Sequence, residues 1–209
     1  TARYGRVCRR DVKNLVLVLL QAPLIALLLA CVFRPGTDFF PLSFYFAVTI
    51  SVIWIGGVNS VREVAREWPL VFREYRAGLS PGAYLAAKVI VFSVLSIVQA
   101  LLFGGFLAAF FRHFRADAVV LLLLAAGSVG GALVGLCVSS LSAGVNRAIS
   151  LLPVVLIPQI FFAGALVPFD RMPRVGRLFS RLTVSRPIFS LLKRTQLLEL
   201  SVWHAEEWI

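Results

Sequence analysis

Long runs of apolar residues alternate with short polar segments along most of the chain. A run of about 20 apolar residues is long enough to cross the hydrocarbon core of a bilayer as a helix. The pattern therefore predicts an all-α integral membrane fold with five visible spans. The predicted spans are Asn14–Phe33, Phe39–Val61, Val89–Phe111, Ala118–Leu141 and Ala148–Phe169.

The polar stretch between the second and third runs, residues 62–88, has helical periodicity of its own. Val61, Val64 and Trp68 recur at i, i+3 and i+7, which places them on one face of a helix. The rest of the stretch carries charges of both signs, on Arg62, Glu63, Arg66, Glu67, Arg73, Glu74 and Arg76. This pattern predicts an amphipathic helix at the membrane surface, which is either an ordinary loop helix or a docking helix for a cytosolic partner. The mixed signs favour the partner, because binding to anionic lipid alone would need only cations.

The region after Pro168 is amphipathic instead of uniformly apolar. Its first part carries an apolar stripe at helical spacing, formed by Val175, Leu178, Phe179 and Leu182. Beside this stripe lie three arginines, Arg174, Arg177 and Arg181. A second stripe, with Ile188, begins after Pro187. Neither piece is long enough and free enough of charge to span the membrane. We therefore expect short amphipathic or re-entrant helices at one membrane surface.

Composition narrows the class of protein. Hydrophobic residues make up 59% of the chain, charged residues 15%, and the mean hydropathy is +0.89. These values exceed those of soluble domains, so they disfavour a soluble enzyme and exclude a disordered chain. The net charge of +11 indicates, in a membrane protein, topology signals and contact with lipid headgroups. We therefore expect membrane lipids as partners, and no nucleic acid.

The positions of the cations predict a cytoplasmic N-terminus. Lys and Arg concentrate before the first run and between the second and third, whereas the alternate loops hold few. Cytoplasmic loops carry such an excess, and the first helices usually set the orientation. The arginine-rich tail opposes this topology, because five spans place it outside.

The predicted spans contain no residues that indicate ion coupling or catalysis. They contain no Asp, Glu, Lys or Arg, and ion-coupled carriers usually keep an ionisable group at membrane depth. The sequence also has no ATPase phosphate loop and no visible catalytic or metal-binding spacing. We therefore expect no catalytic residue, no metal site and no cofactor in this chain, and any energy for active transport must enter from elsewhere.

Two groups of small or neutral residues stand out in the apolar runs. Gly127, Gly131 and Gly135 have the four-residue spacing that lets helices approach closely. Neutral polar residues in or beside the spans either bond to other helices or line a ligand path. These are Gln21, Asn59, Gln99, Asn146 and Gln159.

Three segments resemble the G subfamily (White/pleiotropic drug resistance type) of ABC transporters. Phe72–Lys88, FREYRAGLSPGAYLAAK, resembles the charged segment that follows the second span there. Phe161–Pro173, FFAGALVPFDRMP, resembles the end of the fifth span, and Val184–Leu192, VSRPIFSLL, a later element in which Pro187 replaces a Tyr. The likeness covers most of the chain. It is strongest to bacterial members in which a forkhead-associated domain and an ATPase domain can precede the membrane domain.

The resemblance implies a type-2 ABC exporter transmembrane domain over residues 1–209. Such a domain has six spans, so the sequence is expected to stop short of the sixth. Residues 1–13 would be a connecting segment, 62–76 the coupling helix region and 170–200 an outer re-entrant region. The seven charged residues of 62–76 named above would then couple the spans to the ATPase.

The resemblance also implies a central cavity between two copies of the domain. Val52 and Ile55 on the second span, and Ile157 and Ile160 on the fifth, match cavity-lining positions. An apolar plug above the cavity matches Ala165 and Leu166, where Ala165 is smaller than the usual Leu. Packing against helices or lipid is the alternative role for all six residues.

Together these observations predict the membrane-spanning half of an ATP-driven exporter of lipid-like or amphipathic cargo, in a bacterial inner (plasma) membrane. ATP and Mg would bind a fused or separate nucleotide-binding domain, and only the complete transporter would hydrolyse ATP. Two rivals remain: a non-catalytic membrane anchor or assembly subunit, and a membrane enzyme acting on lipid headgroups.

Overall fold

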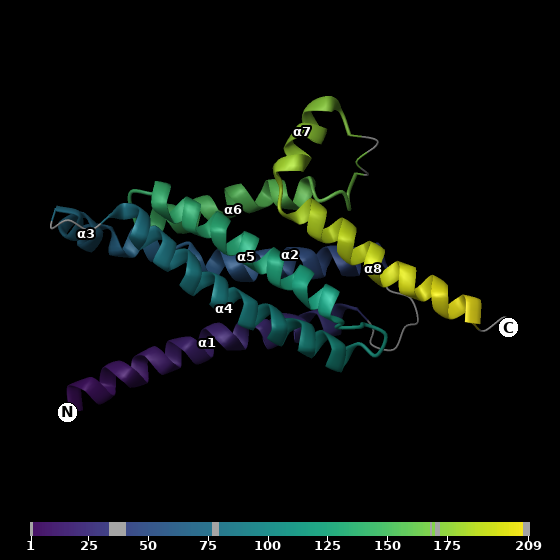
Figure 1. Ribbon diagram of the computed structural model, residues 1–209, viewed down its shortest axis with the longest axis horizontal. Helices are drawn as coiled ribbons and strands as arrows, with labels where there is room; N and C mark the ends of the chain where they lie inside the picture. The colour runs from purple at the N-terminus through teal and green to yellow at the C-terminus, as the bar shows by residue number, and fades with distance from the viewer. Residues whose placement is uncertain (1, 34–40, 77–79, 168, 170–171, 207–209) are drawn as a thin grey trace.

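The structure is a computed structural model. It describes the backbone of residues 2–33, 41–76, 80–167, 169 and 172–206, and the side chains of residues 15–195 within those ranges, except 69, 70, 72 and 74–76. All regular elements in this part of the chain are helices (Figure 1). They are α1 (Ala2–Val32), α2 (Leu42–Ser60), α3 (Glu63–Arg76), α4 (Pro81–Phe110), α5 (Ala118–Leu141), α6 (Val145–Phe161), α7 (Arg174–Leu182) and α8 (Ser185–Glu206).

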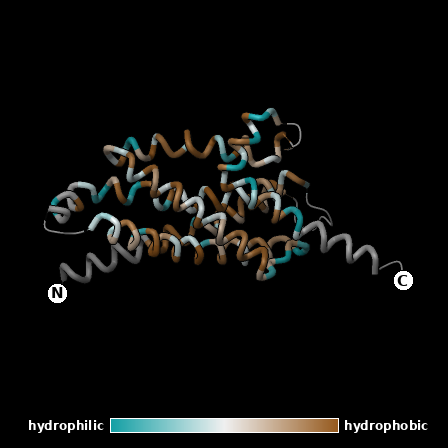
Figure 2. The backbone as a smooth tube through the Cα atoms, turned by 45° about the horizontal axis from the view of Figure 1, so that its top comes forward, coloured by the Kyte–Doolittle hydropathy of each residue, from teal (hydrophilic) through white to brown (hydrophobic). Residues whose placement is uncertain are grey.

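The predicted all-α membrane fold is confirmed in its first four spans. Within the described residues, the segments long and apolar enough to cross a membrane are Leu15–Val32, Leu42–Trp68, Pro81–Phe110 and Ala118–Leu141. Figure 2 shows apolar residues through the middle of the bundle and polar residues mainly at its ends. Many large apolar side chains of α1, α4 and α5 are exposed, as expected for helices that face lipid.

Two predicted boundaries differ from the structure. The third span begins at Pro81, not Val89, because the Ser80 hydroxyl accepts a hydrogen bond from the Ala83 amide and caps the helix (3.3 Å). The fifth predicted span, 148–169, is a shorter helix of 17 residues that ends at Phe161. The backbone turns there, and Gly164 adopts a φ of 90°, a conformation that residues with a Cβ rarely adopt.

The pair α2–α5 forms the centre of the bundle and makes its most extensive helix contact. A Cβ added at Gly56 of α2 would overlap the Ser128 carbonyl oxygen, and one at Gly131 of α5 would overlap that of Ile53. The glycines therefore bring the two backbones into direct contact, as the glycine spacing on α5 predicted. Gly135 lies in the same seam, against Ser60 and Gly57.

The tail contains one short helix and one long helix. α7 matches the predicted short amphipathic helix. α8 is longer than predicted, with 22 residues, and its first half packs on α2 and α5 through Ile188, Phe189 and Leu192. Pro187, read as a break, lies in the first turn of α8, where no intrahelical amide bond is lost.

Figure 1 also shows how the ends of the bundle are arranged. α3, the α5–α6 turn and the N-terminus lie at one end, here named the α3 end. α4 ends and α5 begins at the opposite end, toward which α6 and then α8 run. This arrangement agrees with the alternation of loops that the cation pattern predicted.

Candidate functional site

The helix α3 is the candidate site, and two acidic residues fasten it to the next helix. Glu67 Oε1 accepts a hydrogen bond from Lys88 Nζ (2.8 Å), and Glu67 Oε2 accepts one from the Tyr84 hydroxyl (2.8 Å). Lys88 also lies 3.6 Å from Glu63, whose carboxylate pairs with Arg66 at 3.2 Å. These contacts can form together because Glu63 and Glu67 lie one turn apart on α3, and Tyr84 and Lys88 lie one turn apart on α4. Its side chains are largely shielded: Glu63, Glu67 and Lys88 are 18%, 28% and 19% exposed.

A second bond fastens α3 to the central pair. The amide of Ala65, in the first turn of α3, donates to the Ser139 hydroxyl of α5 (2.9 Å). First-turn amides have no partner within their own helix, so a hydroxyl from a neighbouring helix satisfies one of them. Val64 and Ala65 are buried beside this bond. The start of α3 is therefore held on two sides, by ion pairs and a hydrogen bond to α4 and by a hydrogen bond to a hydroxyl of α5.

The described surface of α3 that stays open is basic. Arg62, Arg66 and Arg73 are exposed. Trp68, predicted on the same helical face as Val64, is 51% exposed, whereas Val64 is buried. The predicted docking face carried both signs, but the structure turns Glu63 and Glu67 toward α4, because Lys88 and Tyr84 offer them partners. Glu74 and Arg76 belong to α3, and their side chains lie outside the described residues. The ATPase-coupling role of all seven residues stays a prediction.

The sequence held a signal for this cluster. Two acids spaced i, i+4 on α3 face a Tyr and a Lys spaced i, i+4 at the start of α4. The predicted third span begins at Val89, after the last charge, and leaves Lys88 in the polar stretch. The charge cluster was thereby missed.

The predicted cavity residues fall into two environments. Val52 and Ile55 are fully buried within the chain, and Val52 lies on the α5 side of its helix, next to Gly127. Ile157 of α6 is 47% exposed, and Ile160 is partly exposed. In this conformation only the α6 pair reaches a surface that a second copy or a cargo could contact. The cavity roles stay predictions.

The predicted plug residues lie just beyond α6. Ala165 packs partly against the hydrophobic core, and Leu166 is largely exposed. No contact in the described residues tests the plug role, which stays a prediction.

Three of the neutral polar residues bond helices together. The Asn59 side-chain amide donates to Gln99 Oε1, and Gln99 Nε2 donates to the Val18 carbonyl, both at 2.6 Å. These bonds join α2, α4 and α1. Gln159 Oε1 accepts from the amides of Val184 and Ser185 at 2.9 and 3.1 Å, which caps the start of α8. Of the two roles left open for these residues, the structure therefore shows helix bonding.

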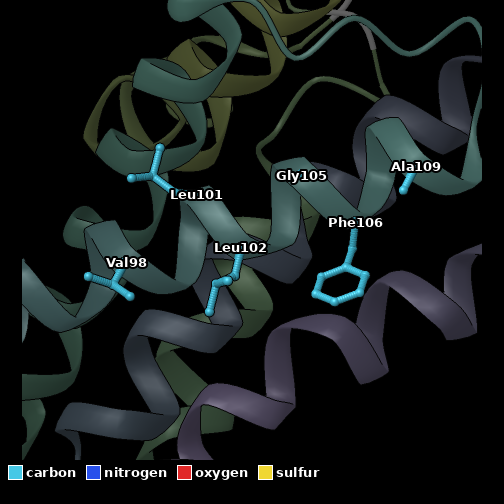
Figure 3. Close-up of a pocket in the computed structure, with 6 residues that line it drawn as sticks. All are labelled: Val98, Leu101, Leu102, Gly105, Phe106 and Ala109. Atoms are coloured by element: carbon cyan, nitrogen blue, oxygen red, sulfur yellow. The ribbon is translucent and has the colours of Figure 1, made fainter.

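An apolar groove of about 440 Å³ runs along one face of α4. Figure 3 shows its lining side chains, with α1 crossing nearby. The lining is Val98, Leu101, Leu102, Gly105, Phe106 and Ala109. Its apolar lining could accommodate an alkyl chain but contains no side chain that could act in catalysis. Among the described residues, no group of His, Cys, Asp or Glu could hold a metal ion.

Comparison with known proteins connects this architecture to transport. A family model described as "ABC-2 type transporter", a membrane domain, matches residues 2–197. A similar protein is the ABC transporter ATP-binding/permease protein Rv1747 of Mycobacterium tuberculosis, 27% identical over 129 residues. The match covers 58% of this chain, and 15% of the length of that relative.

Proposed function

The chain belongs to the ABC-2 type transporter family, and from this premise we propose that it is the membrane-spanning half of an ATP-driven exporter. Members of this family are integral membrane components of transporters. The proposal adds three elements to that membership: coupling to an ATPase through α3, a second copy of the domain, and a lipid-like or amphipathic cargo.

The observation that carries the coupling role is the double anchorage of α3. Its described open face is basic, whereas Glu63 and Glu67 hold α4 and the Ala65 amide reaches α5. A partner that pushes or pulls on Arg66 and Arg73 would move the start of α4 and the end of α5 together with α3. Because α5 shares a glycine seam with α2, that motion would reach the centre of the bundle.

The ATPase itself is proposed from the relative. The printed name of the Mycobacterium tuberculosis protein joins an ATP-binding part to a permease part. We propose that a nucleotide-binding domain, fused or separate, binds ATP and Mg and docks at the α3 end. This assigns the α3 end and the N-terminus to the cytoplasm of a bacterial inner membrane. We also propose that the protein belongs to the G subfamily and that its complete chain includes a forkhead-associated domain.

The second copy and the cargo are supported by α6. Apolar side chains remain exposed along this helix, at Ile149, Leu151, Val154, Val155, Ile157 and Phe161. A second domain packed across them would bury this surface and enclose an apolar cavity in which Ile157 and Ile160 face the cargo. An apolar lining selects lipid-like or amphipathic molecules over free ions.

Charge reversal on α3 tests the proposal in the complete transporter reconstituted into vesicles. Glu74→Arg should abolish ATP hydrolysis that depends on transport, while the vesicles retain the protein. Asp117→Arg, just before α5 at the opposite end, is the matched control and should leave turnover near the parent level. If the chain is only a membrane anchor, Glu74→Arg will weaken binding of the soluble partner and leave no transport activity to lose. If it leaves transport intact, the coupling assignment is wrong.

A further inference from the structure

The arginine-rich helix α7 has no role in the exporter mechanism proposed above. It follows α6 toward the opposite end of the bundle, where the cation pattern is hardest to explain. α7 is attached to the end of α6 through Ser180 and Phe179. The buried hydroxyl of Ser180 donates to the Phe162 carbonyl at 3.1 Å, and the ring of Phe179 stacks on that of Phe162 at 5.9 Å between centroids. The helix therefore has a defined orientation on the end of α6.

In that orientation most of the apolar stripe of α7 stays exposed. Leu178 is 61% exposed and Leu182 is 75% exposed. Val175 and Phe179 of the same stripe are also more than half exposed. Soluble surfaces rarely keep four large apolar side chains exposed along nine residues. Something apolar covers this stripe in the native environment.

A basic stripe lies beside the apolar one. Arg174, Arg177 and Arg181 are all exposed, and α7 contains no acidic residue. Among the described residues, none of the three arginines is in an ion pair with a carboxylate. Guanidinium groups pair with phosphate through two parallel hydrogen bonds, so the stripe is suited to phosphate groups.

The charges decide between the occupants of this face. A second copy would present an identical α7, and a two-fold contact between the stripes would bring like charges together. The surface of an anionic bilayer instead offers acyl chains for the leucines and phosphates for the arginines. A helix with one apolar face flanked by Arg is the pattern of helices that lie in the plane of the interface.

We propose that α7 lies in the bilayer interface near the end of α6 and binds the phosphates of anionic lipids through Arg174, Arg177 and Arg181. This accounts for cations in a segment that the positive-inside pattern leaves unexplained, because their role is lipid binding instead of topology. It is independent of α3 and of the ATPase.

The test places a bimane fluorophore at Leu178→Cys in the complete transporter, with all its other cysteines, Cys8, Cys31 and Cys137 among them, replaced by alanine. The protein is reconstituted in phosphatidylcholine nanodiscs that contain doxyl-labelled phosphatidylcholine or doxyl-labelled phosphatidylglycerol. We expect strong quenching by both lipids and a clear preference for phosphatidylglycerol. Arg174→Gln, Arg177→Gln and Arg181→Gln together should remove that preference, with a loss of up to roughly fivefold per arginine.

Two matched variants make the result specific. Replacing the same three arginines by lysine should retain most of the preference, and Arg112→Gln, a lost cation in the α4–α5 connection, should not change it. Equal quenching by the two lipids in the parent protein would overturn phosphate binding. A bimane quenched by aqueous iodide, or by neither iodide nor lipid, would overturn the interfacial position and assign the stripe to water or to a protein partner.

Discussion

The two amphipathic helices α3 and α7 meet their surroundings in opposite ways. α3 turns Val64 inward, pairs its described acids with α4 and keeps Arg66 and Arg73 exposed. α7 exposes its apolar stripe and its arginines together, and only Ser180 is buried. Amphipathicity by itself therefore does not identify the partner of a helix. Under our proposals the apolar face distinguishes them: the chain covers that of α3 and leaves its charges for a protein, whereas that of α7 stays open to the bilayer.

The largest effect is expected from breaking the charge cluster of α3. Lys88→Met leaves the shielded Glu67 carboxylate without its paired cation, which should cost roughly 1–3 kcal/mol for a partly buried pair. A cost above about 1.4 kcal/mol, which covers most of this range, lowers the population of docked α3 tenfold or more. ATP-driven transport in vesicles should fall accordingly. Adding Glu67→Gln to Lys88→Met should recover part of it, and no recovery would mean that the pair does not hold α3.

A smaller effect is expected at the second anchor of α3. Ser139→Ala removes the acceptor of the Ala65 amide, which should cost about 1–2 kcal/mol. Hydrogen exchange should accelerate in the first turn of α3. Ser140→Ala is the matched control, because within the described part of the chain its hydroxyl bonds to the Cys137 carbonyl of its own helix (2.9 Å). Equal exchange in the two variants would contradict the anchoring role of Ser139.

The smallest effect is expected on α7. Leu178→Ser should change thermal stability in detergent by no more than about 0.5 kcal/mol, because the side chain is 61% exposed. Val64→Ser on α3 is the contrasting variant and should destabilise by roughly 2–3 kcal/mol. A large loss from Leu178→Ser would show that α7 packs against protein.

The sequence predicted the spans well because twenty-residue apolar runs have few alternatives. It also predicted the close approach of α5 through Gly131 and Gly135. The end of α6 was mispredicted, because apolar residues continue past Phe161 while the backbone turns. α8 was mispredicted because Pro187 has different meanings in the first turn and in the middle of a helix.

The candidate site was predictable in place but not in detail. The periodicity of residues 61–68 located α3, yet periodicity cannot show which charged residues turn back onto a neighbouring helix. The pairing of Glu67 with Lys88 depends on how α4 begins, which is a tertiary property. The apolar groove on α4 was equally invisible, because its lining residues do not differ in type from those that face lipid.

The most direct test of the central claim is photocrosslinking from α3 in the complete transporter in membranes. Benzoylphenylalanine at Arg73 should crosslink to the nucleotide-binding domain, with a yield that changes when ATP is added. The same residue at Leu178 of α7 should crosslink to lipid. Crosslinks from position 73 to lipid alone, with no adduct to an ATPase in any nucleotide state, would contradict the account.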